Sequence, residues 1–393
     1  MAAMLKKALS VVAVLLIAAS TCAAGPEVRS DHPDTYVVKK GDTLWDISGM
    51  FLKNPWYWPE IWQANPQIAN PHLIYPGDAI SLVYIDGEPR LMVNGEAPEV
   101  APKARDDGAS EAIPPLPLSS IRQFLSRPRV LSEEEWQSAP YFAAVEENRI
   151  VGHAYQLGYA RRFEGELKVG QQFAIMRPTV VYTDVPAGWF WQKDKRKVES
   201  RSWQASDQWH WSLREWVSER GAETLGHEVV EIGMATVSVL GDPATLYVTY
   251  SEMEVRRGDL LLPVEEAPHP LNFYPHAPAN TAIDARVIGL TGGFDRAGPN
   301  DVIVLSRGAQ DGVEVGEVYS IYQPGEVVHD EVAYPKGSYR AFFNPHDKKV
   351  KLPDEFNGHV MVFRTFDRIS YGLVMNGVKP IPLGARLDAP TQL

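Results

Sequence analysis

The side chains that most often ligate metals or act as nucleophiles are few in this sequence. Its 393 residues include ten histidines and a single cysteine, Cys22. The histidines form no H-x-H pair and no H-E-x-x-H motif, and neither His269 with His276 nor His346 beside Asp347 has the spacing of a metal site. The carboxylates are too numerous for one acid pair to stand out. The sequence therefore predicts no metal, no cofactor and no enzyme activity.

Two turns offer a different chemistry, the recognition of an uncharged ligand. Gly41-Asp42 lies in "GDTLWDIS" and Gly77-Asp78 in "NPHLIYPGDAISL", each beside an apolar run. The formal net charge of -12 argues against nucleic acid as the main ligand, because phosphate binding depends on accumulated Lys and Arg. A neutral sugar or another protein fits this composition better.

The segment that holds these turns reads strand, helix, helix, strand. The predicted strands are Tyr36 to Lys39 and Ala79 to Val83. Asp42 or Thr43 caps a first helix, whose apolar residues recur at helical spacing as Leu44, Ile47 and Phe51. A second helix starts near Pro59, a good first-turn residue, and ends at Asn65-Pro66.

The stretches "YVVKKGDTLWDIS" and "NPHLIYPGDAISL" resemble the two ends of a LysM domain, a small βααβ module that binds N-acetylglucosamine-containing glycans such as peptidoglycan and chitin. The resemblance places the domain at residues 34–85 and implies a shallow groove between its first and last loops. Ile74 and Tyr75 would form the floor of that groove. The glycan-binding residues that it implies are Gly41, Asp42, Thr43, Leu44, Asn70, Ile74, Tyr75, Pro76 and Gly77. Gly41, Pro76 and Gly77 are needed for the turns whether or not a sugar binds.

The stretch "KNPWYWPEIW" between the two helices departs from the plainer sequences of many LysM domains. Trp56, Tyr57, Trp58 and Trp62 could stack on sugar faces. They could also complete the core, since a domain this short must bury large side chains to be stable. The second interpretation is favoured.

The N-terminus has the layout of a secretory signal peptide. Lys6 and Lys7 precede an apolar stretch from Ala8 to Ala19, and small residues follow through Ala24. We expect cleavage after Ala24, which removes residues 1–24 with the only cysteine and leaves a mature chain without a transmembrane helix. A single membrane anchor and a lipoprotein modified at Cys22 are the alternatives.

The rest of the chain reads as a linker followed by a β-rich region. Residues 86–118 are rich in Pro, Ala and acidic residues and lack periodicity. In the region that follows, Leu131-Ser132-Glu133 indicates a capped helical turn, and most other segments read as short strands.

The β-rich region contains stretches of sequence that resemble each other. Residues 159–178 align with 305–324, matching Arg161 to Arg307, Val169-Gly170 to Val315-Gly316, Phe173 to Tyr319 and Ile175 to Ile321. Residues 233–263 likewise parallel 358–390 with one gap. The expected fold class is therefore α+β: a small βααβ LysM domain followed by a mainly β C-terminal region built of two related halves, 119–267 and 281–393.

A second aromatic cluster, residues 188–216, holds six of the eleven tryptophans around a basic run from Lys193 to Lys197. This segment could dock a protein partner, because Trp and Arg are favoured at interfaces. The alternative is a hairpin with a charged tip and a buried aromatic face.

The whole arrangement, with "MVFRTFDRISYGLVM" as its most specific piece, resembles the type IV pilus secretin-associated proteins of Gram-negative bacteria. The resemblance implies a periplasmic peptidoglycan-binding anchor, associated with the outer membrane through a secretin partner. A wall-bound scaffold of another envelope machine, such as a flagellar ring, and a peptidoglycan hydrolase or hydrolase activator are the alternatives.

Overall fold

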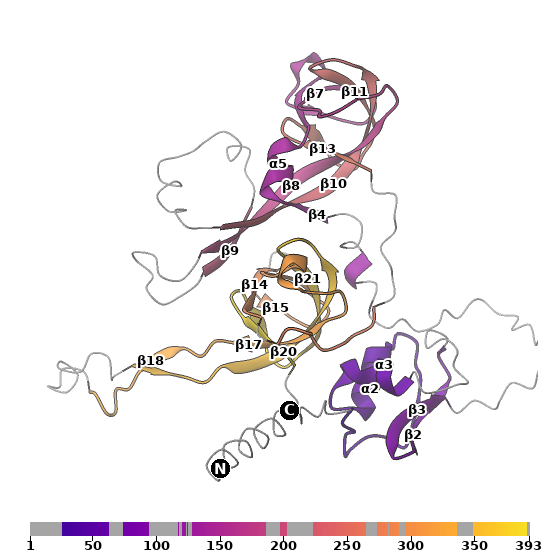
Figure 1. Cartoon of the computed structure of the whole chain (residues 1–393), viewed down its shortest axis with the longest axis vertical. Helices are drawn as coiled ribbons and strands as arrows, with labels where there is room; N and C mark the ends of the chain where they lie inside the picture. Colours follow the sequence, from indigo (N-terminus) through magenta and orange to yellow (C-terminus); the bar gives the residue numbers. More distant parts are fainter. Residues whose placement is uncertain are drawn as a thin grey trace, which may run out of the picture. The chain divides into compact units, whose positions relative to one another are not determined.

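The computed structural model describes residues 26–62, 74–93, 117, 120–122, 124, 128–185, 197–202, 223–264, 273–281, 283–290, 296–335 and 349–390. The chain forms two compact units, an N-terminal unit within Met1–Leu116 and a C-terminal unit, Pro117–Thr391 (Figure 1). The predicted signal peptide and most of the Trp-rich segment 188–216 lie outside the described ranges. Within those ranges, no helix combines the length and apolar character needed to cross a membrane.

The N-terminal unit has the predicted order of strand, helix, helix and strand, followed by one more strand. Its elements are β1 (Thr35–Val37), α2 (Leu44–Phe51), the 3₁₀ turn η1 (Pro55–Tyr57), α3 (Trp58–Trp62), β2 (Ala79–Ile85) and β3 (Glu88–Val93). Thr43, one of the two predicted caps, is the N-cap of α2: its hydroxyl accepts from the Asp46 backbone N–H, and the Asp46 carboxylate accepts from the Thr43 backbone N–H. The predicted end of the second helix at Asn65-Pro66 lies outside the described residues.

The core of this unit is aromatic. Trp56, Trp58 and Trp62 are each at most 2% exposed. Trp58 and Trp62 pack with the buried side chains of α2, and the Trp56 ring lies 6.5 Å from that of Trp45 on α2. The core interpretation is therefore confirmed for the three tryptophans, whose rings are not available to stack on a sugar, and Tyr57 is half-buried against the same core. Three large indoles supply the apolar area that a unit of this size needs for stability.

Strand β3 corrects the predicted start of the linker. Residues 88–93 pair with residues 80–85 of β2, from Ile85 opposite Glu88 to Ile80 opposite Val93. Leu91 is fully buried in the core, and the Arg90 guanidinium donates to the Glu60 carbonyl oxygen at 3.1 Å. The Pro and acidic residues around 88–93 suggested a linker, but burial of Leu91 makes this segment part of the fold.

In the described part of the C-terminal unit, six strands close into a ring that we call the first barrel. In ring order they are β5 (Tyr141–Val145), β7 (Leu157–Arg161), β11 (Ala244–Ser251), β10 (Glu223–Val239), β8 (Gln172–Val185) and β13 (Leu260–Pro263). Phe142, Ile175 and Leu246 are among the side chains that fill the interior. The shorter elements around it are β4 (Pro128–Leu131), α5 (Glu133–Ser138), η2 (Glu146–Asn148), β6 (Val151–Gly152), β9 (Lys197–Ser202) and β12 (Val255–Arg256).

Helix α5 confirms the predicted capped turn. Its N-cap is Ser132, which forms a capping box with Glu135. The Glu133 carboxylate lies 2.9 Å from Nε2 of His227 on β10, and this contact lowers the pKa of Glu133 below its usual value. The Trp136 ring stacks on the His227 ring at 4.5 Å, so α5 is held against the barrel wall.

A second ring, which we call the second barrel, follows in the described chain. In ring order its strands are β14 (Ala285–Leu290), β16 (Val302–Leu305), β21 (Ser370–Gly377), β20 (Glu355–Thr365), β17 (Val318–Gln323) and β23 (Arg386–Asp388). Val287, Ile321 and Val374 are among its interior side chains. The shorter elements are β15 (Arg296–Ala297), η4 (Ala309–Asp311), β18 (Val327–His329), β19 (Lys349–Lys351) and β22 (Ile381–Pro382).

The two barrels have the same strand order and the same register, which confirms the prediction of two related halves. Ile175 pairs with Gly233 and Leu261, and Ile321 pairs with Gly358 and Leu387 in the same way. The small pair β6–β12 recurs as β15–β22. The twelve strands of the two rings are thus two copies of one six-strand topology.

Close packing repeats as well. A Cβ atom on Gly233 would lie 2.3 Å from the Tyr250 carbonyl oxygen, and one on Gly358 would lie 2.1 Å from that of Asn376. Both copies therefore need glycine where the long strand bulges against its neighbour.

One predicted match shifts by a residue. Leu305 pairs with Ser370 as Ala160 pairs with Ala244, so Arg162 rather than Arg161 is equivalent to Arg307. The chain from Leu305 to Gly316 is one residue longer than the chain from the equivalent Ala160 to Gly170, which displaced the sequence alignment.

Candidate glycan-binding loops

The first Gly-Asp turn is held by the carboxylate of Asp42. Its Oδ2 accepts from the Lys39 backbone N–H and from the Tyr36 hydroxyl, each at 2.8 Å. Gly41 has φ of +99°, a conformation that residues with a Cβ rarely adopt. Burial of the Tyr36 hydroxyl, together with its bond to Asp42, raises the pKa of Tyr36 to about 12, so this hydroxyl stays protonated and keeps donating.

The second Gly-Asp turn is built in the same way. Oδ2 of Asp78 accepts from the Tyr75 backbone N–H at 2.8 Å, and the Asp78 N–H donates to the Tyr75 carbonyl oxygen. Gly77 has φ of +101°. In both turns the aspartate carboxylate therefore holds the backbone N–H three residues before it.

Strand pairing brings the two turns together. Val37, at the end of β1, is opposite Ala79, at the start of β2. The Gly77 N–H donates to the Val38 carbonyl oxygen, and the Val38 N–H donates to that of Asp78. A Cβ atom on Gly41 or on Gly77 would have no other heavy atom within 4 Å, so open space lies beside both glycines.

The predicted site residues divide into surface and core. Gly41 and Gly77 are exposed, and Asp42, Tyr75 and Pro76 are half-buried. Thr43 is a buried cap, and the side chains of Leu44 and Ile74 are fully buried. The expectation that Ile74 forms a ligand floor is therefore wrong: its apolar side chain completes the core beneath the turn. Asn70 lies outside the described residues.

Two residues that position these loops, Tyr36 and Asp78, were absent from the predicted site. The signal for Asp78 was in the sequence, since the second Gly-Asp pair repeats the first. Tyr36 precedes Asp42 by six residues, and only the fold shows that its hydroxyl reaches back across the turn.

Comparison with known families decides the nature of this unit. Residues 36–82 match the family model described as "LysM domain". These residues form a LysM domain. The match covers both Gly-Asp turns, and β3 lies beyond it.

A curated relative shares part of the sequence. The chain is 40% identical over 60 residues to the Bacillus subtilis (strain 168) protein called "Uncharacterized protein YqbP". The alignment covers 13% of this chain and 27% of that protein. The similarity is therefore limited to one module and says nothing about the rest of either chain.

The C-terminal unit contains a cavity of about 780 Å³ where β4 and β13 of the first barrel approach residues 363–366 of the second. Phe163, Phe173 and Phe363 give it an apolar lining, with Glu164 and Arg129 among the polar groups. Among the described residues, no group of three or more His, Cys, Asp or Glu side chains is arranged to hold a metal ion.

Proposed function

We propose that this protein is a peptidoglycan-binding anchor of the periplasm, exported by its N-terminal segment, that ties the outer-membrane secretin of a type IV pilus to the cell wall. The observation that carries the first half is the LysM domain at residues 36–82, a module that generally binds peptidoglycan. The two Gly-Asp turns at one end of the β1–β2 pair form the candidate contact surface.

The chemistry of these turns suits a neutral sugar chain. An acetamido group needs backbone N–H and C=O partners, and the open space at Gly41 and Gly77 leaves the backbone accessible. The half-buried ring of Tyr75 offers apolar surface beside them. The aspartates are already engaged with backbone N–H groups, so the ligand meets a surface of mainly uncharged donors and acceptors.

A binding experiment tests this half. A fragment of residues 26–93, which keeps β3, should sediment with purified peptidoglycan, be displaced by N-acetylglucosamine oligomers, and depend little on salt. Tyr75→Ala should weaken binding about tenfold through the loss of one aromatic contact. Tyr84→Ala is the matched control, because Tyr84 is 63% exposed near the opposite end of β2. A folded fragment that stays in the supernatant would refute the proposal.

The second half of the proposal rests on the C-terminal unit. The stretch that carries the resemblance to secretin-associated proteins lies in β20 and β21 of the second barrel. The unit is separate from the LysM domain, so one part of the chain can hold the wall while the other holds a protein partner. Several weak wall contacts around one assembly gain avidity from effective concentration.

Crosslinking in living cells, followed by identification of the partner, tests this half. The full chain and a secreted chain of residues 117–391 should both capture a secretin, and a secreted fragment of residues 26–93 should not. Recovery of a flagellar ring protein in place of the secretin would favour the scaffold alternative. Release of muropeptides by the purified protein would refute a purely anchoring role.

A further inference from the structure

In each barrel one pair of long strands extends beyond the ring, and in the first barrel β4 and β9 pair with its outer edges. We call residues 177–185 of β8 with 223–230 of β10 the first arm, and β18 with β19 the second arm. The second arm continues the β17–β20 pair of the second barrel, as the first continues β8–β10 of the first barrel (Figure 1). The arms are equivalent parts of the repeated topology.

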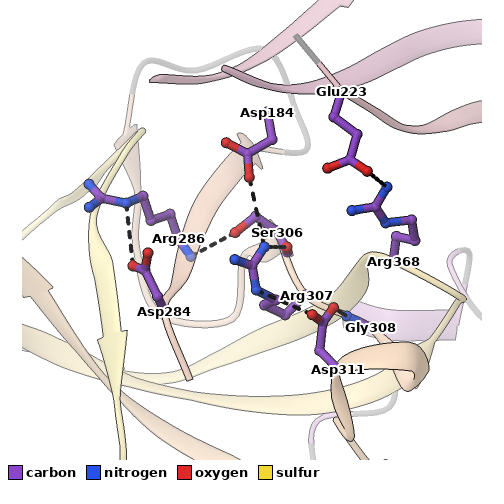
Figure 2. Close-up of polar contacts among 9 residues, drawn as sticks. All are labelled: Asp184, Glu223, Asp284, Arg286, Ser306, Arg307, Gly308, Asp311 and Arg368. Carbon is purple, nitrogen blue, oxygen red and sulfur yellow. Dashed lines mark hydrogen bonds and ion pairs between the residues drawn. The ribbon is translucent and has the colours of Figure 1, made fainter. Parts of the chain in front are cut away.

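The first arm lies on the second barrel of its own chain. Glu223 Oε1 is 2.6 Å from Nη1 of Arg368, and Asp184 Oδ2 is 3.8 Å from Nη1 of Arg307. Figure 2 shows these two acidic side chains pointing toward the two arginines. The arm in this interface is acidic and the barrel is basic.

A buried polar cluster completes the interface. The Glu228 carboxylate accepts from the hydroxyls of Tyr182, on the same arm, and Tyr371, on the barrel, at 2.7 and 2.6 Å. A Cβ atom on Gly289 would lie 3.1 Å from the Tyr182 ring, so this ring packs against β14. Burial raises the pKa of both tyrosines, and their hydroxyls remain donors.

The covered barrel surface has an equivalent in the first barrel. In the second barrel the outward cross-strand pairs are Val304–Tyr371 and Val302–Leu373. All four of these side chains are at most 2% exposed.

The equivalent pairs of the first barrel are Tyr159–Thr245 and Leu157–Tyr247, which we call the β7–β11 face. Tyr247 is 37% exposed, and the other three residues are half-buried. The face that a first arm covers in one barrel is thus partly open in the other. Its tyrosines are among the residues favoured at protein interfaces.

The second arm presents an exposed basic face. The cross-strand pairs Val327–Lys351 and His329–Lys349 lie on one side of the ribbon. All four residues are exposed, with Val327 at 52%. An ammonium group over a tyrosine ring is a favourable contact, which matches this face to the tyrosines of the β7–β11 face.

Charges at equivalent positions differ between the two barrels and between the two arms. Asp242 occupies in the first barrel the position of Arg368 in the second; its side chain is 62% exposed and pairs with Arg161 at 2.9 Å. Arg162 occupies the position of Arg307 and keeps the positive charge there. Lys349 stands nine residues before Gly358, next to the position of Glu223, which stands ten residues before Gly233. The second arm is therefore basic where the first arm is acidic, and repulsion from Arg307 and Arg368 disfavours the second arm on the second barrel.

We propose that the second arm of one molecule docks on the β7–β11 face of a second copy, as the first arm docks on the second barrel within each chain. The contact is heterologous, so it leaves one free arm and one free face on every dimer and leads to rings or longer chains. The partly polar character of the β7–β11 face fits a reversible association, while the apolar second barrel fits a permanent one. This self-association goes beyond the proposed function and does not depend on it.

Sedimentation velocity of residues 26–393 over a concentration series tests the proposal. The parent chain should associate as concentration rises, and Val327→Asp and Tyr247→Asp should each weaken association at least about tenfold. Val378→Asp is the matched control, because Val378 is 72% exposed outside both surfaces. A parent chain that stays monomeric at every concentration overturns the proposal, as does a Tyr247→Asp chain that associates like the parent.

Mixing the two variants tests the heterologous geometry. The Val327→Asp chain keeps its β7–β11 face and the Tyr247→Asp chain keeps its arm, so together they should form a one-to-one dimer and nothing larger. A mixture that stays monomeric overturns the proposal. Asp242→Lys and Lys349→Glu should each weaken association, and the double variant should recover it. A double variant as weak as either single one contradicts the placement of the arm. Circular dichroism of each variant checks that the fold is intact.

Discussion

Strands β11 and β21 hold the same place in the two barrels, yet only β11 alternates. Along β11, buried Leu246 and Val248 lie between the more exposed Thr245, Tyr247 and Thr249. Along β21, the run from Ser370 to Met375 is buried on both sides. The difference arises because the second barrel is covered from outside by the first arm, and Phe124 also packs edge-on against Tyr371 at 6.3 Å. One topology can thus serve as a barrel with an open outer face or as the covered centre of a larger unit.

Separating the two barrels should destabilise the second far more than the first. A fragment of residues 125–264 should unfold cooperatively, since its interior is complete without the second barrel. A fragment of residues 273–390 should lack cooperative unfolding and bind hydrophobic dye, because Val304, Tyr371 and Leu373 lose their cover. Calorimetry and dye fluorescence measure both. A second-barrel fragment with a sharp transition and no dye binding would show that its outer face needs no partner.

A buried ion pair of the first barrel has no counterpart in the second. Arg177 contacts Asp259 at 2.7 Å with side chains 13% and 3% exposed, and the equivalent residues are Gln323 and Ala385. Asp259→Ala should lower the free energy of unfolding by about 3–5 kcal/mol, because it leaves a buried guanidinium unpaired. Adding Arg177→Gln should recover most of this loss. Urea denaturation measures both variants, and equal losses in the single and double variants would contradict the argument.

The Glu228 cluster joins the two barrels, so its loss should be felt by the second barrel more than by the first. Glu228→Gln keeps the shape but weakens the acceptor for Tyr182 and Tyr371, and should cost about 1–3 kcal/mol. Hydrogen exchange should show faster opening around β21 than around β11. Glu231→Gln, a half-buried position on the same strand, is the control and should behave as the parent. If β21 is equally protected from hydrogen exchange in Glu228→Gln and Glu231→Gln, the Glu228 cluster does not stabilise the second barrel.

The smallest effect concerns pH. Burial lowers the pKa of His359, which is neutral in the folded barrel and has Asn376 Oδ1 2.9 Å from its Nδ1. In the unfolded chain a histidine titrates near pH 6.5, so as pH falls below about 6.5 the unfolded state takes up a proton that the folded state resists. Stability contributed by the neutral ring is thus present above that pH and lost below it. His359→Met, which copies the equivalent Met234 of the first barrel, should flatten the fall in melting temperature between about pH 7 and pH 5. An unchanged slope would contradict this assignment.

The sequence predicted those elements whose local signals, such as a helix cap or apolar spacing, agree with the burial of their side chains in the fold. Thr43 with Leu44, Ile47 and Phe51 predicted α2, and the Ile175–Ile321 match predicted that the β-rich region consists of two related halves. Pro89 and the acidic residues near it hid β3, whose place depends on Leu91 reaching a core formed by residues far away in the chain. Ile74 was assigned to the ligand surface because it adjoins the turn, but its fully buried side chain belongs to a core formed with residues distant in the sequence, such as Leu44 and Leu91. The match of Arg161 to Arg307 failed for the same kind of reason, since loop length is invisible until pairing fixes the register.

The arms could not be foreseen at all from local pattern. Their strands read like any other alternating segment, and the contacts that distinguish them, such as Tyr371 to Glu228, join residues 143 positions apart. Contacts of this kind follow from the folded topology, which single segments do not specify.

Strand β3 also decides how the LysM domain responds to pulling. Val93, where the strand ends, is opposite Ile80 at the start of β2, the same end of the sheet as both Gly-Asp turns. For a glycan held at those turns and a load applied through residue 93, the β2–β3 ladder opens one residue pair at a time from Val93 inward. Opening in sequence needs less force than shearing all the pairs at once. Opening from Val93 withdraws Leu91 from the tryptophan core almost at once, so burial of this one side chain sets the resistance of β3, and its full release would lengthen the chain by about 20 Å before the other strands part.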